Sequence, residues 1–299
     1  MSRKILRLLL IPALFFAVAS AQQLEPPQLL INAPPELAAL RTRLESAASN
    51  RLTGILELVG LDNAGPVIRV SLVPESAELA RQVPQWIAGF ALGASDEIVI
   101  FPARSPQYPH NSLDDVLRHE VTHVLITRAA ARQSVPRWFN EGLAMAAERS
   151  WGFGDQTRLL YQLVLGRDTS LAEMERLFED SQSSPSSEAR AYALSGALVR
   201  DLVEQHGPAA PREILARMRG GAAFDRAFAE ITGVTPGEAE SDFRQRQRIW
   251  TTWFPIITSS ATLWVAVTII ALWAIRRRRQ KDAALRRKFE EEEKKEDGI

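Results

Sequence analysis

Two histidines and a glutamate lie within one five-residue stretch, His119-Glu120-Val121-Thr122-His123. Residues four apart lie on the same face of a helix, so the imidazoles of His119 and His123 can bind one Zn²⁺ ion together. Glu120 points slightly around the helix, where its carboxylate reaches a metal-bound water rather than the metal. This H-E-x-x-H arrangement predicts metal-assisted hydrolysis with Glu120 as the general base.

The motif is short and also arises by chance, so its surroundings matter. Apolar residues flank it on both sides: Val116, Leu117, Val124 and Leu125. They predict a partly buried helix, on which polar side chains need partners because an unpaired buried charge is costly. The chain has only four histidines, and two belong to the motif. We interpret the others, His110 and His206, as a loop residue and a residue at a helix C-terminus.

A third ligand is available on the helix predicted to follow the motif. This helix is expected to run from about Arg137 to Glu148, with Pro136 at its start, and it carries Asn140-Glu141-Gly142. The intervening segment is long enough for the first helix to end and for the chain to turn back antiparallel. Glu141 is therefore the expected third ligand, which leaves a fourth coordination position for water.

The stretch HEVTHVL, followed by VPRWFNEGLAMAAE, resembles the thermolysin-like gluzincins, particularly the bacterial peptidase MA-like domains. The resemblance covers the chain from about Pro66 to Trp250. It implies one Zn²⁺ ion held by His119, His123 and Glu141, with Glu120 as the catalytic base. It also implies a peptide or protein substrate. We expect an extended peptide to lie along the edge strand of the sheet by strand addition, with Glu97–Phe101 and Trp86–Leu92 as the two candidate strands.

Tyr192 is a further catalytic residue implied by this resemblance. In the related aminopeptidases a tyrosine opens a later helix and stabilises the oxyanion, and Tyr192 opens such a helix here. The alternative interpretation is a core tyrosine whose hydroxyl reaches the surface. The Gly-x-Met-Glu-Asn segment that binds the substrate's amine in those enzymes is replaced by the sequence 88–93, AGFALG, so aminopeptidase specificity is not expected. Met145 replaces the acidic residue that lies four after the third ligand in thermolysin, so another residue must orient a ligating histidine.

The pattern of elements predicts an α+β fold, with a small, mostly antiparallel sheet and a helical lobe, as in thermolysin-like zincins. Three strands are expected, of which the last two form a hairpin: Val67–Val73, Trp86–Leu92 and Glu97–Phe101. Ser112 is expected to cap the helix that carries the two histidines, which then continues to about Arg128. Residues 22–35 are interpreted as a linker, followed by a helix over 36–48. Further helices are expected near 155–165, 170–179, 188–205, 211–219, 222–231 and 236–249.

Both ends of the chain carry apolar segments. Residues 1–21 have the pattern of a secretory signal peptide, with an uncleaved signal anchor as the alternative. Residues 251–276 are expected to form a transmembrane helix, because 253–275 is an uncharged run long enough to cross a bilayer. A buried core helix is the alternative. Four arginines follow at 276–279, so 277–299 is predicted to be a cytoplasmic tail. The domain 22–250 would then face the periplasm or cell exterior.

The composition excludes several other classes of protein. Lys plus Arg and Asp plus Glu each total 36, and the net charge of zero does not suggest a nucleic-acid partner. The absence of cysteine excludes thiolate metal sites and disulfides. A membrane-anchored zinc peptidase is therefore the leading hypothesis. The alternative is a non-catalytic, membrane-anchored binding module, which would have no need of Glu120. No oligomeric state is predicted.

Overall fold

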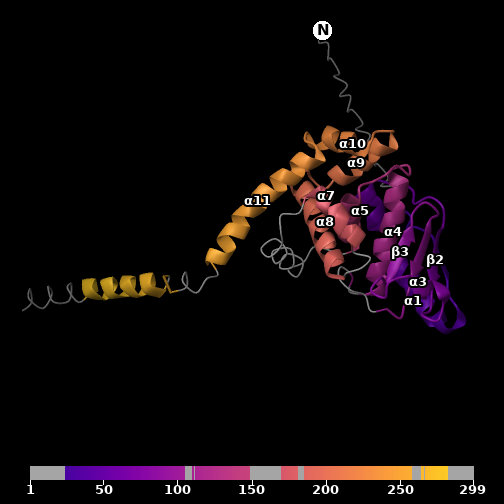
Figure 1. The fold of residues 1–299 in the computed structure, drawn as a ribbon, viewed down its shortest axis with the longest axis horizontal. Helices are drawn as coiled ribbons and strands as arrows, with labels where there is room; N and C mark the ends of the chain where they lie inside the picture. Colours follow the sequence, from indigo (N-terminus) through magenta and orange to yellow (C-terminus); the bar gives the residue numbers. More distant parts are fainter. Residues whose placement is uncertain are drawn as a thin grey trace, which may run out of the picture.

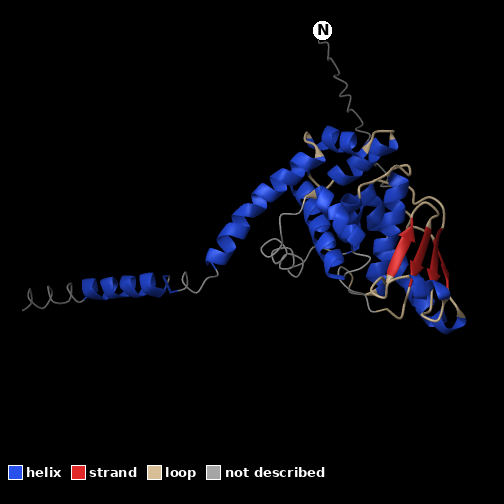
Figure 2. Ribbon diagram, viewed as in Figure 1, coloured by secondary structure: helices blue, strands red, loops and turns tan. Residues whose placement is uncertain are grey.

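The computed structural model describes residues 24–104, 110, 112–148, 170–180, 185–257, 264–265 and 267–281. A four-stranded sheet lies at one side of the domain and helices make up the rest (Figures 1 and 2). The mixture of a small sheet and many helices confirms the predicted α+β class. The predicted signal peptide, the helix near 155–165 and the tail beyond Lys281 lie outside the described residues.

The sheet has the strand order β1-β2-β4-β3. Its strands are β1 (Leu29–Asn32), β2 (Ile68–Leu72), β3 (Gly89–Leu92) and β4 (Glu97–Ile100). The three predicted strands are present, and β3 and β4 form the predicted antiparallel hairpin. However, β1 pairs parallel with β2, and β2 pairs parallel with β4. The prediction of a mostly antiparallel sheet is therefore wrong.

The connections between strands explain the parallel pairing. β1 lies within the segment interpreted as a linker. The chain returns from β1 to β2 through η1 (Pro35–Leu37), α1 (Ala38–Arg51) and α2 (Thr53–Val59). A helical crossover of this kind brings the next strand back in the same direction. Between β2 and β3, α3 (Glu78–Gln82) covers the second face of the sheet, where Ala80 packs against Val99 and Phe101.

Two antiparallel helices follow the sheet. α4 (Leu113–Ala129) begins at the predicted cap, since the Ser112 side chain accepts a hydrogen bond of 3.2 Å from the Asp115 amide. α5 (Arg137–Glu148) begins and ends at the expected residues. The turn between them includes Ala131 and Arg132, both with positive φ. α4 contacts the sheet on one side and α5 on the other, so it forms the centre of the domain.

The helical lobe packs behind α5. It comprises α7 (Leu171–Asp180), α8 (Pro185–His206), α9 (Ala210–Arg219), α10 (Phe224–Thr232) and α11 (Pro236–Ile257), close to the predicted positions. α8 packs against α5 and α7. α11 begins with a capping box. Glu238 Oε2 accepts a hydrogen bond of 2.7 Å from the Thr235 amide, and the Glu238 amide donates one to Thr235 Oγ1. The bond from the Thr235 backbone lowers the pKa of the Glu238 carboxyl.

The predicted membrane segment is described only in part. Residues 264–265 and 267–281 are helical and their side chains are exposed. Within the described residues, no helix is both long enough and apolar enough to cross a membrane.

Candidate metal centre

The three predicted ligands converge at the interface of α4 and α5. His119 Nε2 lies 3.2 Å from Glu141 Oε2, and His123 Nε2 lies 3.3 Å from the same oxygen. All three side chains offer ligand atoms within 4.8 Å of one another. Two donors at tetrahedral positions around Zn²⁺, each about 2.1 Å from the ion, lie roughly 3.4 Å apart. The nitrogen and oxygen donors therefore fit zinc in both type and spacing, with a fourth position left open.

A glycine beside the third ligand determines how closely the helices pack. A Cβ atom on Gly142 would lie 2.4 Å from Val199 Cγ2 and 2.5 Å from the Ser195 carbonyl oxygen. The absence of that side chain lets α8 approach α5 at the turn that carries Glu141. α4 and α5 are joined by Arg118, whose guanidinium donates to the Ala147 carbonyl. These contacts align the three ligand-bearing turns and bring α8 to the site.

Asn140 orients one of the ligating histidines. Its side-chain oxygen lies 2.9 Å from His123 Nδ1. Because an amide oxygen can only accept, Nδ1 carries the proton and the lone pair of Nε2 faces Glu141. The expectation that another residue replaces the missing acidic partner is thus met by the residue immediately before Glu141. The sequence shows only that Asn140 is next to Glu141. Its contact with His123 arises because α4 and α5 cross at this point.

Charges within the site are strongly coupled. Burial acts to lower the pKa of His123, but the Glu141 carboxylate outweighs burial and raises that pKa above its ordinary value of 6.5. Burial likewise acts to raise the pKa of Glu141, but the two histidines hold it well below 4.5. Glu141 is therefore ionised at neutral pH, in the form that binds a metal ion.

Glu120 and Tyr192, the two predicted catalytic residues, lie at the same cleft, although Tyr192 lies inside α8 and not at its start. Glu120 is only 5% exposed, and with Tyr192 it lines a cleft of 370 Å³ that also includes His123 and Glu141. The Tyr192 ring, on α8, lies 5.8 Å from the His119 ring, centroid to centroid. β3 borders the cleft at Gly89, where a Cβ atom would lie 2.8 Å from Val116 and 3.5 Å from Glu120 Cγ. The missing side chain at Gly89 lets the strand lie directly over Glu120.

Of the two histidines outside the motif, His110 lies beside the metal centre and His206 lies away from it. The His110 ring packs edge-on against the His119 ring at 4.7 Å and lies 6.5 Å from the Tyr192 ring, so this loop residue contacts a predicted metal ligand. Its apparent place in a loop gave no indication of this contact. His206 ends α8, as predicted, and lines a separate cavity with residues of α10 and α11.

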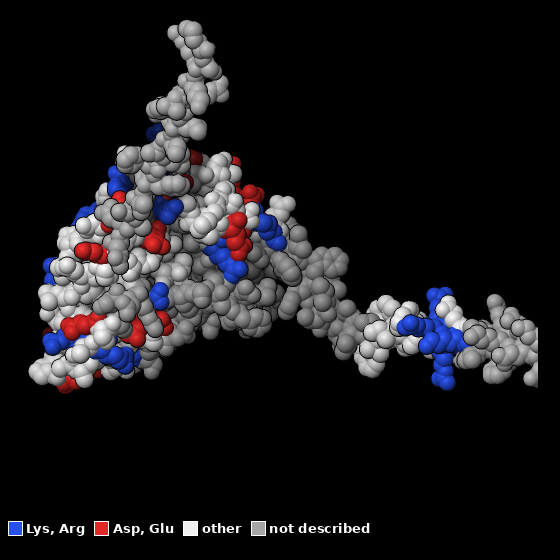
Figure 3. All heavy atoms as spheres, turned by 180° about the vertical axis from the view of Figure 1, so that it is seen from behind, with Lys and Arg blue, Asp and Glu red and all other residues white. Residues whose placement is uncertain are grey.

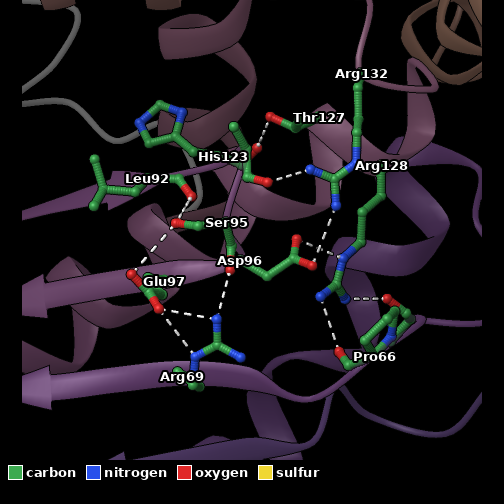
Figure 4. Close-up of polar contacts among 12 residues, drawn as sticks. Pro66, Arg69, Leu92, Ser95, Asp96, Glu97, His123, Thr127, Arg128 and Arg132 are labelled. Atoms are coloured by element: carbon green, nitrogen blue, oxygen red, sulfur yellow. Dashed lines mark hydrogen bonds and ion pairs between the residues drawn. The ribbon is translucent and has the colours of Figure 1, made fainter.

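An ion-pair network anchors the β3–β4 turn to the C-terminal part of α4 (Figure 4). Asp96, in the turn, accepts from Arg128 Nε at 3.2 Å and lies 3.4 Å from an Arg132 nitrogen. Arg128 also donates to the carbonyls of Ala64 and Pro66 in the loop before β2. The turn is therefore held on the helix that carries both histidines, which sets the position of β3 along the cleft.

Comparison with known proteins agrees with this geometry. The sequence matches the Peptidase MA superfamily over residues 60–248, which is more than half of the chain and includes every residue of the site described above. No curated protein matches the chain. A match of this extent, together with the convergence of the three ligands, identifies the domain as metallopeptidase-like. The chain belongs to the Peptidase MA superfamily.

Proposed function

We propose that the protein is a zinc metallopeptidase that hydrolyses peptide bonds at the centre formed by His119, His123 and Glu141. The observation that carries this proposal is the convergence of three donor atoms beside a cleft in which Glu120 is buried. A binding module would have no chemical need for a buried carboxylate next to an open metal position. The Peptidase MA match supports the same class of activity.

Each residue of the site has a distinct task. Zinc bound to the three ligands would supply Lewis acidity, which lowers the pKa of a bound water to about 7 and polarises the scissile carbonyl. Glu120 takes the proton from the attacking water and returns it to the leaving amine. Tyr192 donates a hydrogen bond to the carbonyl oxygen as negative charge develops there. Asn140 keeps the proton of His123 on Nδ1, so that Nε2 remains a ligand.

The substrate is proposed to bind as an added strand on β3. Of the two strands considered from the sequence, β4 is internal to the sheet and β3 lies at its edge. β3 also borders the cleft through Gly89, Phe90 and Ala91. An extended peptide paired with β3 would therefore pass over Glu120 and the metal ligands.

Zinc content and peptide cleavage together test the function. The wild-type protein should bind one zinc ion and cleave an unfolded protein substrate, whereas His123→Ala should lose both properties. Glu120→Gln should keep the zinc and lose cleavage by several orders of magnitude, because the proton acceptor is gone. Glu120→Gln protein that contains zinc and cleaves at the wild-type rate would refute the mechanism. Zinc binding without any cleavage in the wild type would favour a binding module.

We further propose that residues 253–275 anchor the protein in a membrane, with the tail 277–299 in the cytoplasm and the catalytic domain on the other side. The described apolar side chains of this segment are exposed, with Trp264 at 68% and Ile270 at 64%. Figure 3 shows the basic side chains gathered on the C-terminal helix, where Arg276–Arg279 follow the apolar run. Uncharged helical turns followed by arginines are typical of a membrane segment with its basic end in the cytoplasm.

Cell fractionation tests this anchor and its orientation. The protein should resist extraction with alkaline carbonate and become soluble when residues 251–299 are removed. A protease added outside the inner membrane should digest the catalytic domain but spare an epitope at the C-terminus. A mature N-terminus at Gln22 would show that residues 1–21 are a cleaved signal peptide. Release of the full-length protein by carbonate would contradict the anchor.

A further inference from the structure

Arg137 is the cation of the catalytic cleft. It is the first residue of α5, and within the described cleft lining it is the only arginine or lysine. Its Nε lies 3.6 Å from Glu141 Oε1, while Oε2 of the same carboxylate faces the two histidines at 3.2 and 3.3 Å. The guanidinium group is therefore separated from the metal position by a single carboxylate group.

A neighbouring helix holds the guanidinium group in place. Its central carbon lies 4.7 Å from the centroid of the Phe178 ring, on α7, and Nη1 donates to the Phe178 carbonyl at 3.4 Å. α7 is itself joined to the start of α5, since Glu175 Oε1 accepts from the Trp138 amide at 3.4 Å. Stacking on an aromatic face orients a guanidinium group and leaves its N–H edge available.

Most of the hydrogen-bonding capacity of Arg137 is unused. A guanidinium group has five N–H donors. The 3.6 Å separation from Glu141 is longer than a hydrogen bond, so this ion pair satisfies none of them well. In the part of the chain that the structure describes, the Phe178 carbonyl is its one hydrogen-bond partner. The side chain is 43% exposed, which leaves the remaining donors accessible from the cleft.

The location of this arginine is unfavourable for the helix. A positive side chain in the first turn opposes the helix dipole, and α5 has no acidic residue of its own in that turn, where the negative charge comes from Glu175 on α7. Violations of a local preference of this kind are expected at functional or strained sites. Moreover, Glu120 and Glu141 are the carboxylates of the cleft lining, and Arg137 is the side chain of that lining whose positive charge lies outside the metal ligands.

We infer that Arg137 determines specificity by binding a carboxylate of the substrate beside the scissile bond. The carboxylate is either an acidic side chain or the free C-terminus, because both present the two oxygens that match the guanidinium fork. This inference rests on the proposed peptidase function. It identifies the preferred substrates as peptides with a negative charge next to the cleaved bond.

Three zinc-binding dipeptide hydroxamates test the inference without turnover. They share one backbone: the first ends in a free carboxylate, the second in a carboxamide, and the third in a carboxamide with an aspartate side chain. Calorimetry on the full-length, zinc-loaded protein in detergent should show tighter binding of a carboxylate form than of the plain carboxamide, by about tenfold or more. A gain for the first compound indicates recognition of a C-terminus, and a gain for the third indicates an acidic side chain.

The ratio of the affinities for carboxylate and carboxamide is the informative quantity, because any change in metal affinity affects both ligands equally. Arg137→Gln should reduce this ratio to about one, and Arg137→Lys should retain part of it because the charge remains. Arg226→Gln is the matched control. Arg226 also forms an i,i+4 pair with a glutamate, Glu230, but it lies on α10 outside the cleft, and its side chain is 77% exposed. The affinity ratio of the Arg226→Gln variant should therefore equal that of the wild type.

The possible results separate the inference from the function on which it rests. If the wild type binds all three compounds equally, or if Arg137→Gln keeps the wild-type ratio, Arg137 does not select carboxylates. The peptidase function would stand in either case. If none of the three compounds binds to the zinc-loaded protein, the cleft offers no accessible metal position, and the proposed peptidase function fails together with this inference.

Discussion

His123 and Asn140 are hydrogen bonded side chain to side chain, with His123 Nδ1 2.9 Å from Asn140 Oδ1. The bond joins the second histidine of α4 to the residue that precedes the third ligand on α5. It therefore determines the tautomer of His123 and the alignment of the two ligand-bearing helices at once.

We expect Asn140→Ala to weaken zinc binding about 10- to 100-fold, because the partner that orients a ligating histidine is lost. Competition with a chromogenic chelator measures this affinity. Asn140→Asp is the control, since a carboxylate still accepts the Nδ1 proton and should maintain tight binding. Equal zinc affinity in the alanine variant and the wild type would show that the hydrogen bond has no such role.

Gly142→Ala should destabilise the domain. The new Cβ atom would lie 2.5 Å from the Ser195 carbonyl oxygen, so α5 and α8 must move apart. The expected loss in the free energy of unfolding is about 2 kcal/mol, measured by urea denaturation. Gly54→Ala, in α2, is the control because its Cβ atom would meet nothing within 4 Å, and it should be neutral or slightly stabilising. Similar values for the two variants would contradict the packing argument.

Asp96→Asn should reduce stability more than a matched change at the surface. Arg128, whose side chain is only 10% exposed, would lose its carboxylate partner, at a cost of about 2 kcal/mol. Asparagine tolerates the positive φ at this position, so the backbone should not be strained. Glu97→Gln is the comparison. It removes the exposed ion pair with Arg69 and should cost less than about 1 kcal/mol in the same denaturation experiment.

In the metal-free protein, Glu141 should stabilise the fold most within a limited range of pH. The raised pKa of His123 stabilises the fold below pH 6.5, and this contribution is lost as the pH rises through the folded-state pKa. The lowered pKa of Glu141 stabilises the fold above pH 4.5, and this contribution is lost as the pH falls through its folded-state pKa. The difference in unfolding free energy between wild type and Glu141→Gln should therefore be largest between pH 4.5 and 6.5.

Stabilisation by added zinc should show the opposite pH dependence on the alkaline side of this window. Metal binding requires a neutral imidazole, so stabilisation by added zinc should grow as the pH rises from 5 toward 7. Thermal denaturation with and without zinc, at each pH, gives both trends. Stabilisation by zinc that is independent of pH over this range would mean that neither histidine is a ligand.

Tyr192→Phe should lower kcat about 10- to 1,000-fold with little effect on zinc content, because one hydrogen bond to the developing oxyanion is removed. The substitution keeps the aromatic ring and its edge-on contact with Phe178 at 6.0 Å, so the loss should come from the hydroxyl group and not from packing. Wild-type kcat in Tyr192→Phe would support the alternative interpretation of Tyr192 as a core residue.

Much of the candidate site was predictable because its determinants are local. The spacing of His119 and His123 places them on one face of α4 whatever surrounds the helix, and Ser112 caps that helix through a bond within its first turn. Glu141 was also predictable, because Pro136 marks where α5 begins and a short connection leaves neighbouring helices antiparallel.

Contacts between distant segments decided the rest. The four residues of β1 were interpreted as linker because prolines flank them on both sides. Their pairing with β2 and the parallel order of the sheet depend on crossovers that local patterns do not encode. The contact of His110 with His119 likewise arises only when the loop folds over α4. The sequence by itself determined which residues could bind a metal. The tertiary structure decided what surrounds them, since the bond of Asn140 to His123 forms only after α4 and α5 have packed together, and the bond of Arg137 to Phe178 only after α7 has packed beside α5.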